Sequence, residues 1–150
     1  MSNKKKEIFV IIDGSSYLYR AFYALPHLKN NSGSHTGAIF GVTNMINKLI
    51  NDLSPKYICA VFDARGKNFR HRLYKDYKSN RKSMPEELSE QVDPIFDFLK
   101  FMGIQIIQQP DVEADDVIAS LVNDHSSKTK ILISSGDKDL AQLVNKNVQL

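Results

Sequence analysis

The feature that most constrains the fold is a series of short apolar runs, each followed at once by an acidic residue. Residues 7–13 (EIFVIID) and 56–63 (KYICAVFD) both end in aspartate, and residues 130–136 (KILISSG) lead into Asp137. Short runs rich in β-branched and aromatic residues predict buried β-strands. Between them, residues 37–53 place apolar side chains at the three- and four-residue steps of a helix packed on a sheet. Strands that alternate with helices predict an α/β fold, with a parallel sheet flanked by helices.

The other segments extend the same alternation. The apolar faces of the two longest helices are predicted to include Phe40 and Phe101. Residues 148–150 (VQL) resemble the start of another strand, so residues 1–150 are predicted to end inside their domain. Capping, turn and periodicity signals predict the remaining elements: a helix at 15–25, a polar loop at 26–36, a helix from Pro85 to a stop at Gly103, a strand at 104–107, a helix at 113–125 and a short helix at 137–144.

Composition places the chain among soluble globular proteins. Apolar residues make up 42% and charged residues 25%, shares that exclude a mostly disordered chain. No apolar run approaches the roughly 20 residues needed to cross a bilayer, so we expect no membrane partner. The basic start of the chain (MSNKKK) precedes an apolar run that is too short for a secretory signal. Cys59 is the only cysteine, which excludes a disulfide framework or cysteine-based zinc site and favours a reducing, cytoplasmic location.

Acidic residues gather where the predicted strands end. Ligands of open parallel sheets bind beyond the carboxyl ends of the strands, so acids at these positions are expected to converge on one edge of the sheet. A further acidic group opens the helix after residues 104–107, where positions three apart share a helix face, so Glu113 and Asp116 point the same way. The candidate metal ligands are Asp13, Asp63, Glu113, Asp115, Asp116, Asp137 and Asp139.

Each of these carboxylates also has a purely structural interpretation. Asp13 before Gly14 suits a tight turn, and acids at helix starts suit caps and helix dipoles. Their coincidence favours a metal site, because two carboxylates about 4 Å apart repel by about 4 kcal/mol at an effective dielectric of about 20. Divalent cations supply the missing counter-charge, and an all-oxygen ligand set selects Mg²⁺ or Mn²⁺ over zinc or copper. A pair of such cations suits phosphoryl chemistry with water as the nucleophile.

One segment of the chain is strongly basic. Residues 65–82 contain eight Lys or Arg and a single acid, whereas the rest of the chain is net acidic. This predicts a polyanionic partner, although a solvated helix face or an ordinary amphipathic helix gives a similar pattern. On a helix, five residues would share a face: Arg70, Tyr74, Tyr77, Lys78 and Arg81. The cations predict phosphate contacts and the tyrosines predict stacking on unpaired bases, while Lys78 and Arg81 suit the stabilisation of charge on a transferring phosphate.

Four blocks of the sequence resemble the 5′-nuclease domain of bacterial DNA polymerase I, in the flap-endonuclease superfamily. The blocks are IDGSSYLYRAFYALP, VFDARGKNFRHRLYKDYKSNRKSMPEEL, PDVEADDVIASL and SSGDKDLAQLV. They follow the family's order and together span nearly the whole chain. The resemblance implies a PIN-like fold, with residues 65–82 in a basic helical arch and residues 1–150 as the N-terminal part of the nuclease domain.

The resemblance also implies a function. It implies a divalent-metal-dependent, structure-specific DNA 5′-nuclease, with both 5′-3′ exonuclease and 5′-flap endonuclease activity, as in primer removal and repair. Expected partners are Mg²⁺ or Mn²⁺, DNA with 5′ flaps or 5′ ends, and a polymerase region that follows in the same protein. The family has two further metal-binding aspartates that this chain lacks, so we expect an incomplete two-metal site and doubtful activity of this chain alone.

The seven candidate acids all match the family's metal-binding positions. The resemblance adds Arg20 to the phosphate contacts near the scissile bond. The expected catalytic residues are Lys78, Arg81 and Asp116, and the expected DNA contacts are Arg20, Arg70, Tyr77, Lys78 and Arg81.

Two other functions stay open. One is a non-catalytic module that binds branched DNA, and the other is a PIN-type ribonuclease. The seven acids argue against the first, because negative charge near a phosphate weakens DNA binding unless metal compensates. The long basic and aromatic segment favours DNA flaps over RNA as the substrate.

Overall fold

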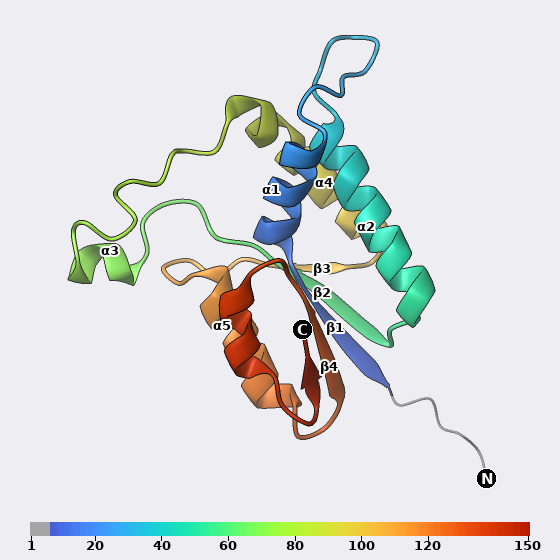
Figure 1. Ribbon diagram of the computed structural model, residues 1–150, viewed down its shortest axis with the longest axis vertical. Coiled ribbons are helices and arrows are strands. Elements are labelled where there is room, and N and C mark those ends of the chain that lie inside the picture. Colours follow the sequence, from blue (N-terminus) through green and yellow to red (C-terminus); the bar gives the residue numbers. More distant parts are fainter. Residues whose placement is uncertain (1–6) are drawn as a thin grey trace.

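The computed structural model describes residues 7–150, which form one parallel sheet with helices on both faces (Figure 1). The basic start of the chain, on which the expectation about a secretory signal partly rests, lies in residues 1–6, outside this range. The strands are β1 (Ile8–Asp13), β2 (Tyr57–Val61), β3 (Gln105–Ile107), β4 (Lys130–Ser134) and β5 (Val148–Gln149). The helices are α1 (Gly14–Ala24), α2 (Gly37–Leu53), α3 (Phe69–Leu73), α4 (Glu86–Phe101) and α5 (Ala114–His125), with a 3-10 helix η1 (Lys138–Leu143).

The strand order β3-β2-β1-β4-β5 explains where a ligand would bind. The chain builds outward from β1 through β2 to β3, then crosses back to place β4 and β5 on the other side of β1. This makes the boundary between β1 and β4 a topological switch point, the place where open α/β sheets bind ligands beyond the carboxyl ends of their strands. Asp13 is the last residue of β1, and Asp137 follows β4 closely. The expected α/β fold with a parallel sheet is confirmed.

Two hydrophobic cores, one on each face, hold the sheet rigid. On one face, α1, α2 and α4 cover side chains such as Val10 and Ile12. On the other, α5 and η1 cover Ile11 and its neighbours, among them Val148 of β5. Successive side chains of a strand point to opposite faces, which is why neighbouring residues of β1 enter different cores. A strand buried on both faces is expected to be apolar throughout, as the sequence of β1 is until its terminal aspartate.

Two predictions about buried aromatic residues are wrong. Phe101 is 92% exposed and Phe40 is 54% exposed. Phe101 follows the buried Leu99 by two residues and Phe40 precedes the buried Val42 by two, a separation of about 200° around a helix. Both rings therefore point away from the sheet. Within residues 7–150, no helix is both long enough and apolar enough to span a bilayer.

A buried glutamine joins α2 to α4. Thr36 precedes α2 but provides no side-chain cap for it. Instead, the Gln91 side chain of α4, 1% exposed, accepts hydrogen bonds from the backbone N–H groups of Ala38 and Ile39 at 2.8 and 3.1 Å. Its amide nitrogen donates to the Glu87 carbonyl at 2.7 Å. Gln91 therefore satisfies N–H groups that a helix N-terminus otherwise leaves without partners.

Replacing this residue tests its contribution to stability. In Gln91→Met, buried N–H groups at the start of α2 lose their acceptor, so we expect the free energy of unfolding to fall by about 1–3 kcal/mol. Urea denaturation followed by circular dichroism measures the change. Gln142→Met, at an exposed position of η1, is the matched control. Equal stability of the two variants would contradict the capping role.

Candidate metal centre and nucleic-acid interface

Asp13 is the most buried carboxylate of the candidate site. It is 4% exposed, and its Oδ1 caps α1 by accepting the Ser16 N–H at 3.0 Å. The Ser135 hydroxyl donates to Asp13 Oδ2 at 2.5 Å and accepts the Asp137 N–H at 2.9 Å. Burial raises the pKa of Asp13, although the Ser135 and Ser16 hydrogen bonds oppose this, and the charges of Asp63 and Asp137 raise it further. The carboxylate is thus fixed in place at the end of β1.

Serine side chains tie together the loops that follow the strands. The Asp63 N–H donates to Ser15 Oγ at 3.1 Å, and the Gly136 N–H donates to Ser16 Oγ at 3.0 Å. The Asp63 carboxylate accepts the Ala114 N–H at 2.9 Å, which links the end of β2 to the start of α5. Neither serine is among the site residues expected from the sequence. The signal that could have indicated them is their position shortly after the strand-end Asp13.

These contacts surround a cavity of about 410 Å³ at the switch point. Five of the seven candidate acids line it, together with two cations of the basic segment and Tyr19, which sequence reasoning did not select. Asp116 and Asp139 are not among its lining residues. The lining is Asp13, Ser15, Ser16, Tyr19, Asp63, Lys78, Arg81, Glu113, Ala114, Asp115, Gly136 and Asp137.

Burial and neighbouring carboxylates raise the pKa of two acids in this cavity, Asp13 and Asp115. Asp115 shows the largest effect: burial, followed by the charges of Asp13, Asp137, Asp63 and Glu113, raises its pKa from 3.8 to about 6. A pKa raised by neighbouring carboxylates is the behaviour expected of a site that lacks its counter-charge. The chemistry of the donors therefore fits a divalent cation, because every acidic side chain lining the cavity offers oxygen, the ligand that hard cations select.

The carboxylates line the cavity without converging on a single point. Within residues 7–150, no three His, Cys, Asp or Glu side chains form a ready-made metal-binding group. The sequence predicts that all seven acids lie at one edge of the sheet. Five of them line the cavity there, and Asp116 and Asp139 lie outside its lining. Their roles as metal ligands stay predictions.

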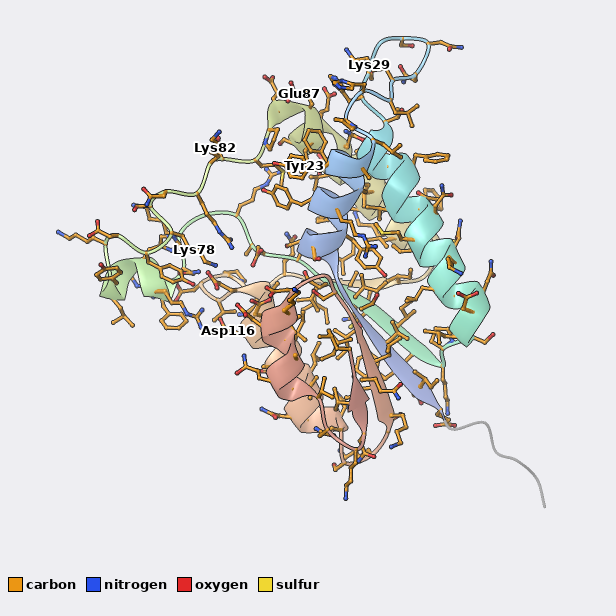
Figure 2. The ribbon with its side chains drawn as sticks, viewed as in Figure 1. Tyr23, Lys29, Lys78, Lys82, Glu87 and Asp116 are labelled. Atoms are coloured by element: carbon orange, nitrogen blue, oxygen red, sulfur yellow. The ribbon has the colours of Figure 1, made fainter. Side chains whose placement is uncertain are left out.

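The basic segment, residues 65–82, docks on the acids at the start of α5. Lys78 Nζ lies 2.6 Å from Glu113 Oε1, and the Tyr77 hydroxyl donates to the same carboxylate at 3.1 Å. Arg70 forms a two-pronged ion pair with Asp116, with N–O distances of 2.6 and 2.7 Å. Figure 2 shows Lys78 and Asp116 where the basic segment meets the start of α5.

These ion pairs control the charge state of both acids. Burial alone would raise the pKa of Glu113, but the hydrogen bond and charge of Lys78 outweigh it, and the net pKa is lowered. The Arg70 hydrogen bonds lower the pKa of Asp116 against the opposing effect of burial. Both acids therefore stay ionised while paired with cations. In this arrangement Arg70 contacts protein, and Arg20, exposed on α1, lies outside the lining of the cavity.

The expectation of a helix through the basic segment is wrong beyond its first turn. Only Phe69–Leu73 is helical, and turns and extended chain follow. Lys78 has a backbone φ of 53°, a left-handed conformation that interrupts any helix. Backbone turn bonds, such as those from the Tyr77 N–H to the Tyr74 carbonyl at 3.0 Å and from the Arg81 N–H to the Lys78 carbonyl at 3.0 Å, take the place of helical hydrogen bonds. Lys78 and Arg81 still reach the same cavity.

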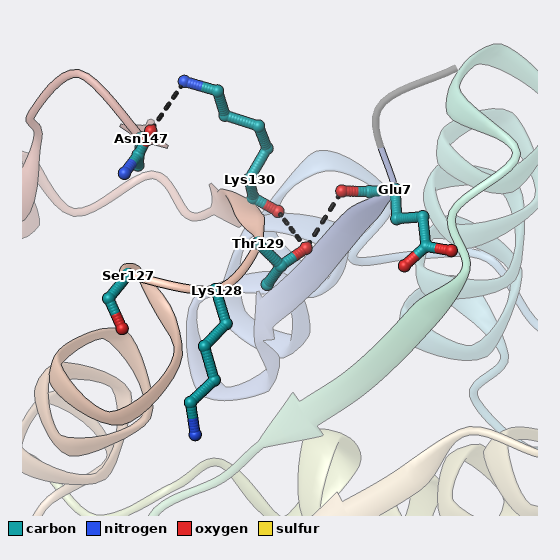
Figure 3. A pocket seen from close by; sticks show the side chains of 6 residues that line it. All are labelled: Glu7, Ser127, Lys128, Thr129, Lys130 and Asn147. Atoms are coloured by element: carbon teal, nitrogen blue, oxygen red, sulfur yellow. Dashed lines mark hydrogen bonds between the residues drawn. The ribbon is translucent and has the colours of Figure 1, made fainter. Parts of the chain in front are cut away.

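The opposite end of the sheet offers a contrast. There, a pocket of about 350 Å³ is lined by Glu7, Ser127, Lys128, Thr129, Lys130 and Asn147 (Figure 3). Lys130 Nζ lies 2.8 Å from Asn147 Oδ1, and the Thr129 hydroxyl donates to the Glu7 carbonyl at 2.9 Å. One carboxylate lines this pocket, against five at the cavity. The concentration of acids thus distinguishes the carboxyl ends of the strands from this opposite end of the sheet.

Comparison with known families accounts for this arrangement. Residues 8–150 match the family described as 5′-3′ exonuclease, N-terminal resolvase-like domain. The chain therefore belongs to this family. The match covers every one of the candidate site residues, from Asp13 to Asp139.

Relatives carry names of the same kind. A 5′-3′ exonuclease of Buchnera aphidicola subsp. Baizongia pistaciae is 45% identical over 148 residues, which are 98% of this chain and 49% of that protein. DNA polymerase I of Pseudomonas aeruginosa is 44% identical over 142 residues, 94% of this chain and 16% of that protein. The chain thus spans about half the length of the exonuclease relative and a smaller share, 16%, of the length of the polymerase. The resemblance to the nuclease part of DNA polymerase I is confirmed.

A solved structure shares the fold. The T5 5′-exonuclease with bound divalent metal ions (zinc) has a TM-score of 0.67 at 22% identity, over 95% of this chain and 54% of that one. This confirms the expected PIN-like architecture of a 5′-exonuclease-family member.

The raised pKa of Asp115 leads to a prediction for the metal-free protein. Its folded-state pKa of about 6 exceeds the ordinary value of 3.8. The protonated form therefore contributes stability at low pH, and this contribution is lost as the pH rises through about 6. Carboxyl NMR should show Asp115 titrating near pH 6, and Asp137→Asn should lower that midpoint by removing one neighbouring charge. A midpoint near pH 4 in the metal-free wild type would contradict the crowding of charge in the cavity.

Proposed function

We propose that the protein containing this chain is a divalent-metal-dependent DNA 5′-nuclease, which hydrolyses phosphodiester bonds at 5′ ends and 5′ flaps. The observation that carries the proposal is the cavity at the switch point, where five carboxylates face Lys78 and Arg81. Membership of the 5′-3′ exonuclease family and the DNA polymerase I relatives support the same activity. Mg²⁺ or Mn²⁺ is the proposed cofactor, because the donors are all oxygen.

The carboxylates of the cavity have a binding task. Asp13 is held by Ser16 and Ser135, and Asp63 by Ala114, so each presents its remaining oxygen lone pairs from a fixed position. Asp115 and Asp137 add charge from α5 and from the loop after β4. Bound divalent cations supply the charge that activates a water nucleophile and stabilises the leaving oxygen. The protein's own contribution is to hold these oxygen ligands in place.

The cations of the basic segment have a second task. Lys78 and Arg81 line the cavity, and in this proposal each donates to the non-bridging oxygens of a phosphate bound there. Such donors stabilise charge as it develops on the transferring phosphoryl group. Tyr77 would stack on the bases of the DNA strand, and the remaining Lys and Arg side chains of residues 65–82 would bind its phosphates. Arg20 and Arg70 would be further phosphate contacts. Arg70 takes up this role only when it leaves Asp116.

Asp116 and Asp139 have conditional places in this proposal. The Asp116 carboxylate is bonded to Arg70, so it reaches a cation only after that ion pair opens. Asp139 lies in the first turn of η1, where its N–H donates to Asp137 Oδ1 at 2.9 Å. Both remain proposed ligands, and Asp116 a proposed catalytic residue, that the cavity as it stands does not contact.

The natural substrate we propose is DNA with a 5′ flap or a free 5′ end, as arises in primer removal and repair. The mixture of Lys, Arg and Tyr in residues 65–82 supports a single-stranded DNA partner, because cations bind its phosphates and aromatic rings stack on its bases. The relatives named DNA polymerase I support a polymerase region elsewhere in the same protein.

Removing one carboxylate of the cavity tests the activity. We expect the natural protein to cleave labelled 5′-flap DNA with Mg²⁺ and not with EDTA, and Asp63→Asn to abolish cleavage while leaving DNA binding intact. Asp124→Asn, an exposed acid on α5, is the control and should cleave normally. Binding without cleavage by the wild type would favour a branched-DNA module, and cleavage of RNA alone would favour a ribonuclease. Either result would overturn the proposal.

Removing the Lys78 ammonium tests the electrostatic role. In Lys78→Ala, we expect single-turnover cleavage to slow by roughly 10²- to 10³-fold, the usual loss for one transition-state donor. DNA affinity should change far less, because many other cations contact the strand. Rapid-quench kinetics and fluorescence anisotropy measure the two quantities, with Lys48→Ala on α2 as the control. A loss confined to DNA affinity would instead make Lys78 an ordinary phosphate contact.

A further inference from the structure

Asn68 is one of three polar side chains that the described residues bury, the others being Asp13 and Gln91. Asp13 belongs to the cavity and Gln91 joins two helices, whereas Asn68 has no part in the chemistry proposed above. It lies at the first turn of the basic segment, just before α3, and is 8% exposed. Burying a polar group costs free energy unless its hydrogen bonds are made. The hydrogen-bond partners of Asn68 therefore indicate what this residue does.

The carbonyl oxygen of the Asn68 side chain bonds within the basic segment. Its Oδ1 accepts the backbone N–H of Arg70 at 3.1 Å and that of His71 at 3.4 Å, and lies 2.7 Å from His71 Nδ1. Asn68 is therefore the N-cap of α3. Ser and Asp cap a helix about as well as Asn does, so capping by itself gives no reason for an amide at this position.

The other end of the side chain reaches the candidate metal centre. Its Nδ2 donates to Glu113 Oε1 at 2.9 Å. Glu113 is 14% exposed and lines the cavity, and it also receives the Tyr77 hydroxyl and Lys78 Nζ. All three donors come from one stretch of eleven residues, 68–78. Asn68 is the one among these donors whose other side-chain atom, Oδ1, is fixed by the helix cap, so its amide reaches Glu113 from a side chain bonded at both ends.

We infer that Asn68 is a positioning residue, which fixes the Glu113 carboxylate relative to the basic segment and thereby holds Lys78 at the cavity. The inference rests on the proposed nuclease function for its catalytic consequence. Without the amide donor, Glu113 Oε1 keeps only Tyr77 and Lys78 as hydrogen-bond donors, and neither of these is the N-cap of α3. Outer-shell hydrogen bonds of this kind commonly change metal affinity or activity by about 10- to 100-fold when they are removed.

Two substitutions separate the amide donor from the helix cap and from charge. Asn68→Ser and Asn68→Asp both keep a capping oxygen, and both lose the amide that reaches Glu113. They differ because aspartate adds a negative charge and serine does not. Asn30→Asp is the matched control: Asn30 also caps a turn, by accepting the N–H groups of Ser32 and Ser34, in the exposed loop between α1 and α2.

The experiment uses the natural protein that contains this chain. We expect both Asn68 variants to cleave 5′-flap DNA about 10- to 100-fold more slowly in single turnovers with unchanged DNA affinity, and Asn68→Ser, which adds no charge, to keep its thermal unfolding midpoint near the wild-type value. Calorimetric titration with Mg²⁺ alone should show weaker binding by Asn68→Ser. Asn30→Asp should match the wild type in every measurement.

Three results would overturn the inference. Wild-type cleavage and Mg²⁺ binding in both Asn68 variants would show that the amide positions nothing. Impairment of Asn68→Asp alone would assign the effect to the added charge. A loss of cleavage that matches a fall in the unfolding midpoint would leave Asn68 as a helix cap only. If the wild type itself cleaves no DNA, the proposed function fails, whereas the Mg²⁺ titration still decides the role of Asn68.

Discussion

Repulsion among carboxylates at the carboxyl edge of the sheet is the constraint on which the rest of the site depends. The parallel register brings the ends of β1, β2 and β4 together, and each end delivers an aspartate to the same cavity. Like charges this close repel, and burial together with these neighbouring charges raises the pKa of Asp115. Two hydrophobic cores, one on each face of the sheet, hold the strands against this repulsion.

The surrounding groups offset the repulsion in two different ways. Near β1, neutral donors are used: Ser16 and Ser135 bond to Asp13 without changing the net charge. Near α5, the basic segment provides cations, with Lys78 on Glu113 and Arg70 on Asp116. Among the residues that the structure describes, the acids beside β1 and β4 therefore lack a positively charged partner. A divalent cation would be bound most favourably there. In the absence of DNA, the same cations that would grip it in the proposed function pair with Glu113 and Asp116 at the start of α5.

The sequence predicts the parts of this arrangement that follow from local pattern. Apolar runs ending in acid predict the strands, and the geometry of parallel sheets then predicts that Asp13, Asp63 and Asp137 meet. The pattern could not predict the path of residues 74–82, because contacts with the loop before α5 override their helical spacing and Lys78 turns left-handed. Nor could it show that Asp116 bonds to Arg70, since that pair joins residues 46 positions apart. The spacing of apolar residues predicts the buried side of α4. Phe101 does not belong to that side, because it lies two residues, about 200° around the helix, from the buried Leu99.

The most direct test of the account is the location of a bound cation. Anomalous diffraction from crystals of the protein grown with Mn²⁺ would show where the ion lies. The account predicts a peak inside the cavity at the β1–β4 boundary, within coordinating distance of Asp13 or Asp63 oxygens. Manganese found only elsewhere, such as beside Glu7 at the opposite end of the sheet, with the cavity free of it, would contradict the central claim.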